Sequence, residues 1–323
     1  MRRVTRLLAA LLAALLLSSC ATPPADDGRL RVVTTLFPYY DLARAVAGEY
    51  ADVSLLLAPG REAHSFEPTP MDAVRLAEAD VFLCNGGESE LWVEELLESA
   101  GENIAVVLRG MDAVDAREEE LVEGMQLAPS AHEHEHEHEH DDGDEDEVEY
   151  DEHIWTSPKN AVLLLDAVCD ALCRADAAHT EAYRKNAENY KGQLVSIDEE
   201  LTKLRENAVR TELIFADRFP FLYLCRDYDL TYRAAFHGCA SDTEPSLATL
   251  RYLIDRVNAE HIPVVLTVDL DSQKIAEAVS ECTGASVATL CSMQTVSRDD
   301  FSNGETYVSI MQRNLNILRI ALQ

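Results

Sequence analysis

Short apolar runs alternate with segments of helical spacing along residues 29–108 of the chain. The runs RLRVVTTLF, DVSLLL, DVFLC and NIAVVL are rich in aliphatic and β-branched residues and are typical of buried strands. Between them, residues 69–79 are amphipathic, with Thr69 as the N-cap and Pro70 at the first helical position. Strands that alternate with helices at this spacing predict a parallel α/β sheet covered by helices.

A long helical pattern divides the chain. Residues 177–209 contain one glycine, Gly192, and no proline. One face of this pattern carries Tyr183, Ala187, Tyr190, Leu194, Ile197, Leu201 and Leu204. Strands and helices then alternate again from residue 212 to residue 322. We therefore expect an α/β protein with two lobes, each with a mostly parallel sheet covered by helices, joined by one long rigid helix. The expected bounds are 30–176 for the N-terminal lobe, 177–209 for the helix and 210–323 for the C-terminal lobe.

The first twenty residues have the pattern of an export signal. Arginines precede the apolar run Leu7–Leu17, which is too short to cross a bilayer, and LSSC places small residues before Cys20. This ending resembles a bacterial lipobox, which implies a lipoprotein signal over residues 1–20 and a lipidated Cys20. An ordinary secretory signal is the alternative. We expect residues 21–29 to be a tether and the protein to lie outside the cytoplasm, anchored to the cell membrane by lipid alone.

A tract rich in histidine and acid interrupts the first lobe. Its histidines alternate with glutamate and are His132, His134, His136, His138 and His140. Neither face of the tract is apolar, so we expect a disordered loop over residues 128–150. Neutral imidazole is a common metal ligand, so the composition predicts auxiliary metal capture. A solubilising loop and an affinity tag are the alternatives. The net charge of −32 argues against a nucleic-acid partner.

The cysteines do not follow the CxxC spacing of a zinc knuckle. Besides Cys20 they are Cys84, Cys169, Cys173, Cys225, Cys239, Cys282 and Cys291. We expect most of them to be buried as small apolar residues. Export permits disulfides, and the pairs Cys225–Cys239 and Cys282–Cys291 both stay open.

Two histidine motifs can supply metal ligands. HSFEPTP places His64 in a turn that two prolines restrain, and DEHIWTSP places His153 after the acidic tract and beside Trp155. Taken alone, His64 fits an exposed loop residue and His153 fits the last member of the tract. A metal site built by two lobes needs nitrogen and oxygen ligands at the ends of elements, far apart in the sequence, and both motifs meet that condition.

Together these motifs resemble the substrate-binding lipoproteins of bacterial zinc and manganese ABC importers. The resemblance extends from Arg29 to the C-terminus and includes the lipobox, the histidine-rich loop, two α/β lobes and the long helix. It implies that His64 and His153 are metal ligands. It also implies a monomer that is not an enzyme and that hands its ion to an importer permease and its ATPase.

The third and fourth ligands depart from the family pattern. Zinc-type relatives carry His and manganese-type relatives carry Glu at the position where FADRFPFLYL has Asp217. An interpretation in which Asp217 only pairs with Arg218 is the alternative. A family acid at the end of a later strand corresponds to Asp269, or to Asp271 if the register differs. We prefer Asp269 because it ends the apolar run.

The choice of metal depends on more than these ligands. Two imidazoles and two carboxylates accept Zn²⁺, Mn²⁺ or Fe²⁺, and the imidazole-rich loop favours zinc by the Irving–Williams order. Glu244, which resembles a family position near the site, and His237, expected on a surface loop, are further candidates. An exported zinc enzyme is disfavoured because HExxH and a nucleophile elbow are absent, and because four protein ligands would leave no position for water. A role as an adhesin stays open.

Overall fold

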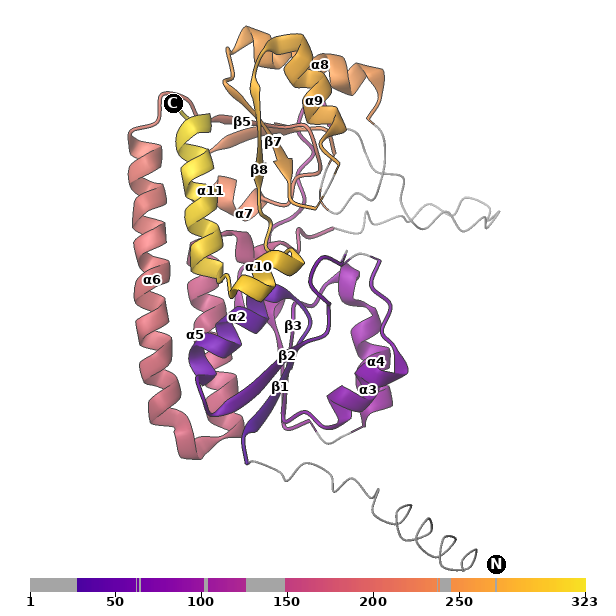
Figure 1. Ribbon diagram of the computed structural model, residues 1–323, viewed down its shortest axis with the longest axis vertical. Coiled ribbons are helices and arrows are strands. Elements are labelled where there is room, and N and C mark those ends of the chain that lie inside the picture. Colours follow the sequence, from indigo (N-terminus) through magenta and orange to yellow (C-terminus); the bar gives the residue numbers. More distant parts are fainter. Residues whose placement is uncertain are drawn as a thin grey trace, which may run out of the picture.

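The computed structural model describes residues 28–61, 63, 65–101, 104–125, 149–236, 238, 245–270 and 272–323. They form two lobes stacked along the long axis of the molecule, with one long helix beside both (Figure 1). Each lobe contains a four-stranded sheet in which all paired strands are parallel. The predicted α/β fold, with two helix-covered sheets and a long linking helix, is confirmed.

The two sheets have the same strand arrangement. The order is β2-β1-β3-β4 in the N-terminal lobe and β6-β5-β7-β8 in the C-terminal lobe. The strands are β1 (Leu30–Thr34), β2 (Ala51–Leu55), β3 (Val81–Cys84), β4 (Val106–Arg109), β5 (Glu212–Phe215), β6 (Thr231–Ala234), β7 (Val264–Val268) and β8 (Ser286–Leu290). The order reverses between β1 and β3, and between β5 and β7. Open α/β sheets bind ligands at such points, outside the carboxyl ends of the strands.

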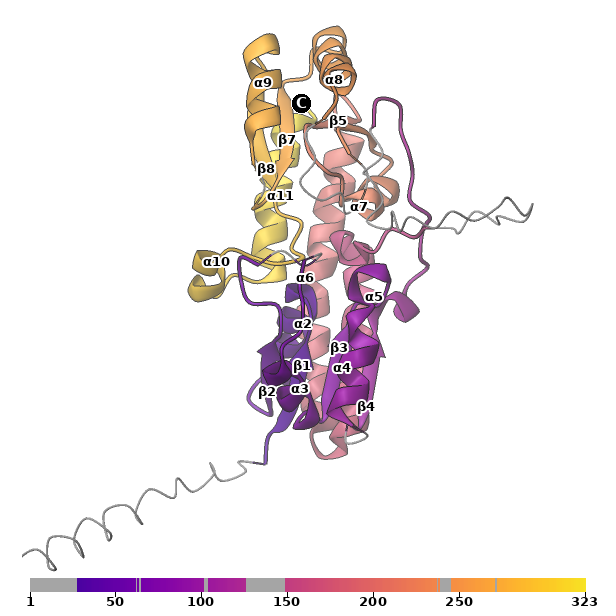
Figure 2. The ribbon, with the colours of Figure 1, turned by 90° about the vertical axis from the view of Figure 1, so that its right-hand side faces the viewer.

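Helices cover both faces of each sheet (Figure 2). They are α2 (Phe37–Ala47), α3 (Pro70–Ala77), α4 (Trp92–Ala100), α5 (Pro158–Ala175), α6 (Thr180–Glu206), α7 (Leu222–Asp227), α8 (Leu247–Ala259), α9 (Lys274–Thr283), α10 (Arg298–Asn303) and α11 (Tyr307–Ala321). The predicted start of α3 is confirmed, since the backbone N–H of Thr69 donates to Oδ2 of Asp72 at 2.8 Å.

Neighbouring residues of a strand face different cores. Val32 of β1 packs in the core that contains residues of α2 and α5, and Val33 packs with residues of α3 and α4. Because helices cover both faces of the sheet, its strands need no polar side and form continuous apolar runs. β1 ends at Thr34, earlier than the predicted strand over residues 29–37, because α2 already begins at Phe37.

The linking helix α6 runs beside both lobes. Its 27 residues correspond to a length of about 40 Å. The buried residues, Tyr183, Ala187, Tyr190, Leu194, Ile197 and Leu201, belong to the predicted face. The helix is shorter than the predicted 177–209 for two reasons. It is preceded by a 3₁₀ turn, Ala177–His179. At its other end the chain turns towards the C-terminus, where the N–H of Val209 donates to the carbonyl of Leu322 at 3.0 Å.

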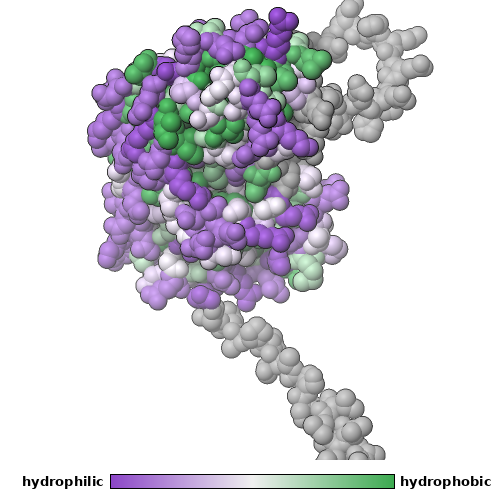
Figure 3. Space-filling model, turned by 45° about the horizontal axis from the view of Figure 1, so that its top comes forward, coloured by the Kyte–Doolittle hydropathy of each residue, from purple (hydrophilic) through white to green (hydrophobic). Residues whose placement is uncertain are grey.

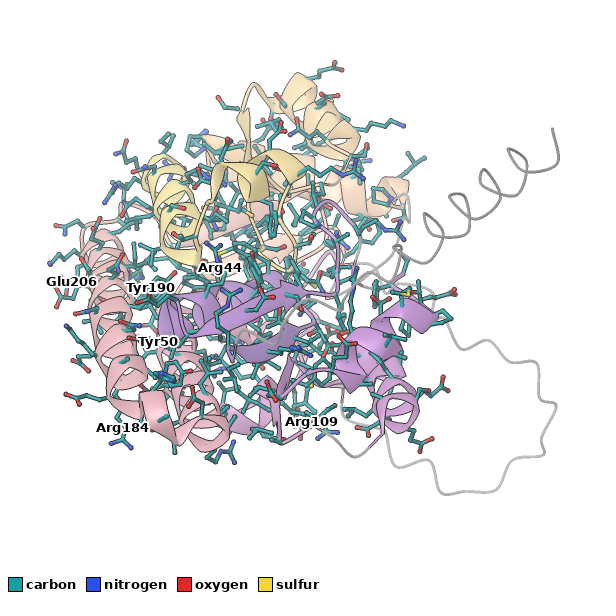
Figure 4. The ribbon with its side chains drawn as sticks, turned by 60° about the horizontal axis from the view of Figure 1, so that its bottom comes forward. Arg44, Tyr50, Arg109, Arg184, Tyr190 and Glu206 are labelled. Atoms are coloured by element: carbon teal, nitrogen blue, oxygen red, sulfur yellow. The ribbon has the colours of Figure 1, made fainter. Side chains whose placement is uncertain are left out.

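A buried carboxylate joins α2, α6 and α11. Asp41 of α2 accepts hydrogen bonds from the hydroxyl of Tyr190 on α6 and, at 2.9 Å, from the backbone N–H of Tyr307 at the start of α11. Tyr190 and Arg44 line the same pocket at this junction (Figure 4). Burial raises the pKa of Asp41, and both hydrogen bonds oppose that shift. The contact ties α11, which follows the C-terminal sheet, to the first helix of the N-terminal lobe.

A second buried carboxylate makes stability depend on pH. Glu90 follows β3, is 5% exposed, and accepts hydrogen bonds from the N–H groups of Asn85 at 2.7 Å and Gly86 at 2.9 Å. Burial raises the pKa of Glu90 from 4.5 to about 7. Between pH 4.5 and about pH 7, the carboxyl of Glu90 is therefore protonated in the folded chain and ionised in the unfolded chain. Ionisation of Glu90 thus destabilises the fold progressively as the pH rises from about 4.5 to about 7.

We expect Glu90→Gln to raise the melting temperature at pH 7.5 and to change it little at pH 5, because an amide does not ionise. The pKa shift corresponds to at most about 3 kcal/mol. Thermal melts at both pH values test this, with Glu88→Gln, an exposed residue of the same turn, as the control that changes neither. A gain of equal size at both pH values would exclude ionisation of Glu90 as its cause.

Candidate metal centre

The carboxyl ends of the two sheets face each other across the junction of the lobes. The N–H of Phe37, which follows β1, donates to the carbonyl of Gln294 at 3.3 Å. The N–H of Gly60, which follows β2, donates to the carbonyl of Val296 at 2.8 Å. Both acceptors follow β8. Because all paired strands of each sheet are parallel, the residues that follow them are directed to this junction, where the strand order predicts a ligand site.

The segment Asp151–Ser157 is buried at the junction. Trp155 is 1% exposed, and its Nε1 donates to the carbonyl of Ser292, in the C-terminal lobe, at 2.7 Å. The carbonyl of Trp155 accepts a hydrogen bond from the hydroxyl of Tyr307 at 2.8 Å. The indole packs edge to face against His153, with 5.6 Å between ring centroids. Contacts from the C-terminal lobe and from α11 thus hold the segment that carries His153.

His153 has the hydrogen bonding expected of a metal ligand. It is 2% exposed, and its Nδ1 lies 3.1 Å from Oδ1 of Asp151, which also accepts the backbone N–H of His153 at 2.7 Å. A proton on Nδ1 satisfies this carboxylate and places the lone pair on Nε2, the arrangement in which a carboxylate orients an imidazole for a metal. The burial argues against His153 as an exposed member of the tract. Its role as a ligand stays a prediction.

Asp217 supplies a buried carboxylate just after β5. Its Oδ1 accepts the backbone N–H of Arg218 at 2.8 Å, and its Oδ2 accepts the backbone N–H of Val268, the last residue of β7, at 2.9 Å. These bonds hold the carboxylate where the strand order of the C-terminal sheet reverses. A carboxylate offers about four lone-pair sites, so two backbone hydrogen bonds are compatible with cation binding.

Asp269 follows β7 and turns towards the segment after β8. Its Oδ1 accepts the backbone N–H of Ser292 at 2.6 Å, and its Oδ2 lies 3.3 Å from the donating Sγ of Cys291. Burial raises the pKa of Asp269. Asp269 therefore positions this segment, and its role as a ligand stays a prediction. Gln294, buried in the same segment, was not among the sequence candidates. The polar run CSMQT follows the last strand and is the sequence signal that could have indicated Gln294 as a candidate.

Several predicted site residues lie outside the described residues. They are His64, Asp271, His237, Glu244, Cys20, His132, His134, His136, His138 and His140. Within the part of the chain that the structure describes, no group of three or more His, Cys, Asp or Glu residues is placed to hold a metal ion. The complete ligand set therefore stays a prediction, of which His153, Asp217 and Asp269 can be located.

The described cysteines are free thiols. They are Cys84, Cys169, Cys173, Cys225, Cys282 and Cys291. Of the pairs left open by the sequence, Cys282–Cys291 is therefore not formed, and Cys225 is a free thiol, while Cys239 lies outside the described residues. Cys84, Cys169 and Cys225 are buried, as expected of small apolar side chains, whereas Cys173 and Cys291 are half-buried and Cys282 is exposed.

The surface mixes hydrophilic and hydrophobic residues on the face drawn in Figure 3, with a group of hydrophobic residues on the C-terminal lobe. Among the residues placed by the structure, no helix is long and apolar enough to cross a membrane.

Comparison with known families gives one match that covers most of the chain. The model of the family described as "Zinc-uptake complex component A periplasmic" matches residues 32–321. Among curated proteins, the chain is 31% identical over 294 residues to the high-affinity zinc uptake system protein ZnuA of Bacillus subtilis strain 168, covering 91% of this chain and 88% of that protein.

Two further comparisons concern a streptococcal protein. The chain is 30% identical over 319 residues to the zinc-binding lipoprotein AdcA of Streptococcus pneumoniae strain R6. The match covers 99% of this chain but 61% of that relative, so this chain spans about three fifths of the length of AdcA. The structure of the Zn(II)-bound ZnuA-like domain of Streptococcus pneumoniae AdcA is similar, with a TM-score of 0.71, 27% identity, and coverage of 91% of this chain and 99% of that one.

Proposed function

This chain belongs to the zinc-uptake complex component A family, and we propose that it captures Zn²⁺ outside the cytoplasm, between its two lobes, and delivers the ion to the permease and ATPase of an ABC importer. Zinc is the cargo in this proposal. The names of two relatives, a zinc-binding lipoprotein and a high-affinity zinc uptake protein, support it.

The observation that carries the proposal is the pair His153–Asp151 at the junction of the lobes. The pair is buried, and its 3.1 Å contact presents the imidazole in the orientation that metal ligands need. Asp217, buried in the other lobe, adds a carboxylate that zinc accepts. Together with His64 and Asp269 this set would surround the ion with protein ligands. Such a closed site favours capture and release over catalysis, which requires an open coordination position.

Manganese or iron uptake is the second candidate. Asp217 stands where zinc-type relatives carry a histidine, and an additional carboxylate shifts the preference of a site towards harder ions. We favour zinc because two imidazoles remain and because the histidine-rich loop suits zinc better than manganese.

We propose that Cys20 carries a lipid anchor and that the protein acts as a monomer at the outer face of the membrane. The AdcA relative of Streptococcus pneumoniae is named a zinc-binding lipoprotein, which supports the anchor. A protein held beside the permease would hand over its ion over a short distance. The loop histidines would raise the local concentration of zinc at the same place, as tethered ligands do.

Deleting His132–His140 is expected to remove weak zinc sites and to leave one tight site. The chain with and without this tract is stripped of metal, and Zn²⁺, Mn²⁺ and Fe²⁺ are added without oxygen while heat of binding and melting temperature are recorded. The tight site should raise the melting temperature most with zinc, by an amount worth about 4 kcal/mol when free zinc is about 1,000 times the dissociation constant.

Other results would redirect the proposal. Loss of the tight site on deletion would place it in the tract and not between the lobes. A tight site that prefers Mn²⁺ or Fe²⁺ would establish the second candidate. If neither form of the chain has a tight site, the chain is not a metal-capture protein.

A further inference from the structure

Backbone hydrogen bonds pair two segments of the N-terminal lobe. Arg117–Glu119 and Glu149–Asp151 run antiparallel, and the N–H of Asp151 donates to the carbonyl of Arg117 at 2.9 Å. We call these two segments the stalk. Asp151, at the end of the stalk, is the residue whose carboxylate contacts the imidazole of His153.

One side chain of the C-terminal lobe bonds to both segments of the stalk. The hydroxyl of Tyr223, on α7, donates to the carbonyl of Asp151 at 2.7 Å and accepts the N–H of Arg117 at 3.0 Å. Tyr223 is 1% exposed. Burial raises the pKa of Tyr223 to about 12, so the hydroxyl keeps its proton at neutral pH and can both donate and accept.

We propose that Tyr223 is a positioning residue for the metal ligand His153. Its hydroxyl holds the backbone of Asp151, and the carboxylate of Asp151 holds the imidazole. Asp217 lies six residues before Tyr223 in the same connection of the C-terminal lobe. The connection that supplies the carboxylate ligand thus also sets the orientation of the imidazole supplied by the other lobe. The inference rests on the proposed function, because it assumes that His153 binds the ion.

The helix α7 is held in place without the hydroxyl. Asp227, at its end, accepts hydrogen bonds from the hydroxyl of Ser157 and, through its carbonyl, from Nζ of Lys159 at 2.9 Å. The guanidinium of Arg117 lies 3.5 Å from the carboxylate of Asp227. We therefore expect Tyr223→Phe to fold. The variant leaves the carbonyl of Asp151 and the N–H of Arg117 without this partner, so it should also unfold more easily.

The test compares Tyr223→Phe with Tyr228→Phe in the full chain. Tyr228 ends the same helix, is buried, and its hydroxyl donates to Asp198 at 2.7 Å, away from the stalk. Zinc affinity is measured by competition with a chelator, and the visible spectrum of the Co²⁺-loaded protein reports the geometry of the ligands. Removing a partner that orients a metal ligand lowers affinity by about 10- to 100-fold. Tyr223 acts one contact further away, through Asp151, so we expect a loss at the lower end of this range, about 10-fold, with a changed Co²⁺ spectrum, and neither effect for Tyr228→Phe.

The outcomes separate the inference from the proposed function. If the unmodified chain lacks a tight zinc site, the proposed function fails. If it has one, and Tyr223→Phe keeps the affinity and the Co²⁺ spectrum while its melting temperature falls, Tyr223 is merely structural and the inference is wrong. Equal losses in both tyrosine variants would likewise overturn it, since they would reflect general destabilisation.

A second variant gives an independent measurement. Asp151→Asn should weaken zinc binding and change the Co²⁺ spectrum in the same way, because both residues act through the imidazole of His153. The effects of Tyr223→Phe and Asp151→Asn on zinc affinity should then combine to less than their sum in the double variant. Fully additive effects would show that Tyr223 does not act through Asp151 and would overturn the inference.

Discussion

Replacing His153 with alanine is expected to remove tight zinc binding. The imidazole is buried at the junction of the lobes, and Asp151 orients it through a 3.1 Å contact. Removing a residue that hydrogen-bonds to a metal ligand lowers the affinity for the metal by about 10- to 100-fold. Removing the ligand itself should therefore lower the affinity by more than about 100-fold. Competition with a chelator of known zinc affinity measures the loss. The melting temperature in excess zinc should also fall towards the value of the metal-free protein.

A matched control exists at the far end of the molecule. His179 precedes α6 and forms a similar pair, with Nδ1 2.6 Å from Oδ2 of Asp176. His179→Ala removes an imidazole and its carboxylate contact without touching the junction, and it should leave zinc affinity unchanged. Unchanged affinity in His153→Ala, or equal losses in both variants, would mean that His153 is not a ligand. His64→Ala should match His153→Ala, since the resemblance assigns both histidines to one site.

Trp155→Ala is expected to lower the free energy of unfolding by about 4 kcal/mol. The indole is buried, its Nε1 donates to the carbonyl of Ser292 at 2.7 Å, and it is part of the core that extends through both lobes. Truncation would leave a large cavity and an unpaired carbonyl where the lobes meet. Unfolding in denaturant, followed without metal, measures the loss, and zinc affinity should fall as well because the ring packs against His153.

Two variants separate the causes of this effect. Trp155→Phe keeps most of the ring but loses the N–H, so it should cost about 1 to 3 kcal/mol. Leu172→Ala removes a buried side chain near the end of α5, next to the turn Ala177–His179 and away from both histidine motifs, and it should lower stability without changing zinc affinity. A loss below about 1 kcal/mol for Trp155→Ala would contradict its role between the lobes.

The architecture follows from local patterns because burial repeats along each element. The predicted face of α6 is buried, and the predicted apolar run DVFLC contains the fully buried strand β3. Errors occur where elements end. α6 begins three residues after the predicted start because the preceding residues form a 3₁₀ turn, in which Asp176 accepts the N–H of Ala178 at 3.2 Å. Capping contacts of this kind compete with helix continuation and leave a weak signal in the sequence.

The candidate site was predicted in part. The motif DEHIWTSP indicated His153 and Trp155, and FADRFPFLYL indicated Asp217. The sequence did not indicate that Trp155 bonds to Ser292, 137 residues away, or that Tyr223 bonds to Asp151, 72 residues away. Nor did it indicate that Asp269 holds the backbone of Ser292. The disulfide pairs were undecided, and the free thiols of Cys282 and Cys291 show that these two do not pair.

By itself the sequence determined the two parallel sheets, the long helix and the histidine motifs, because hydrophobic periodicity and short motifs are properties of neighbouring residues. Only the tertiary structure decided that the carboxyl ends of the sheets meet, that Trp155 and Tyr223 connect the lobes, and which backbone groups each buried carboxylate binds. The physical reason is that these hydrogen bonds join residues that are far apart in the sequence and meet only when the two lobes pack together. No pattern of neighbouring residues encodes that packing.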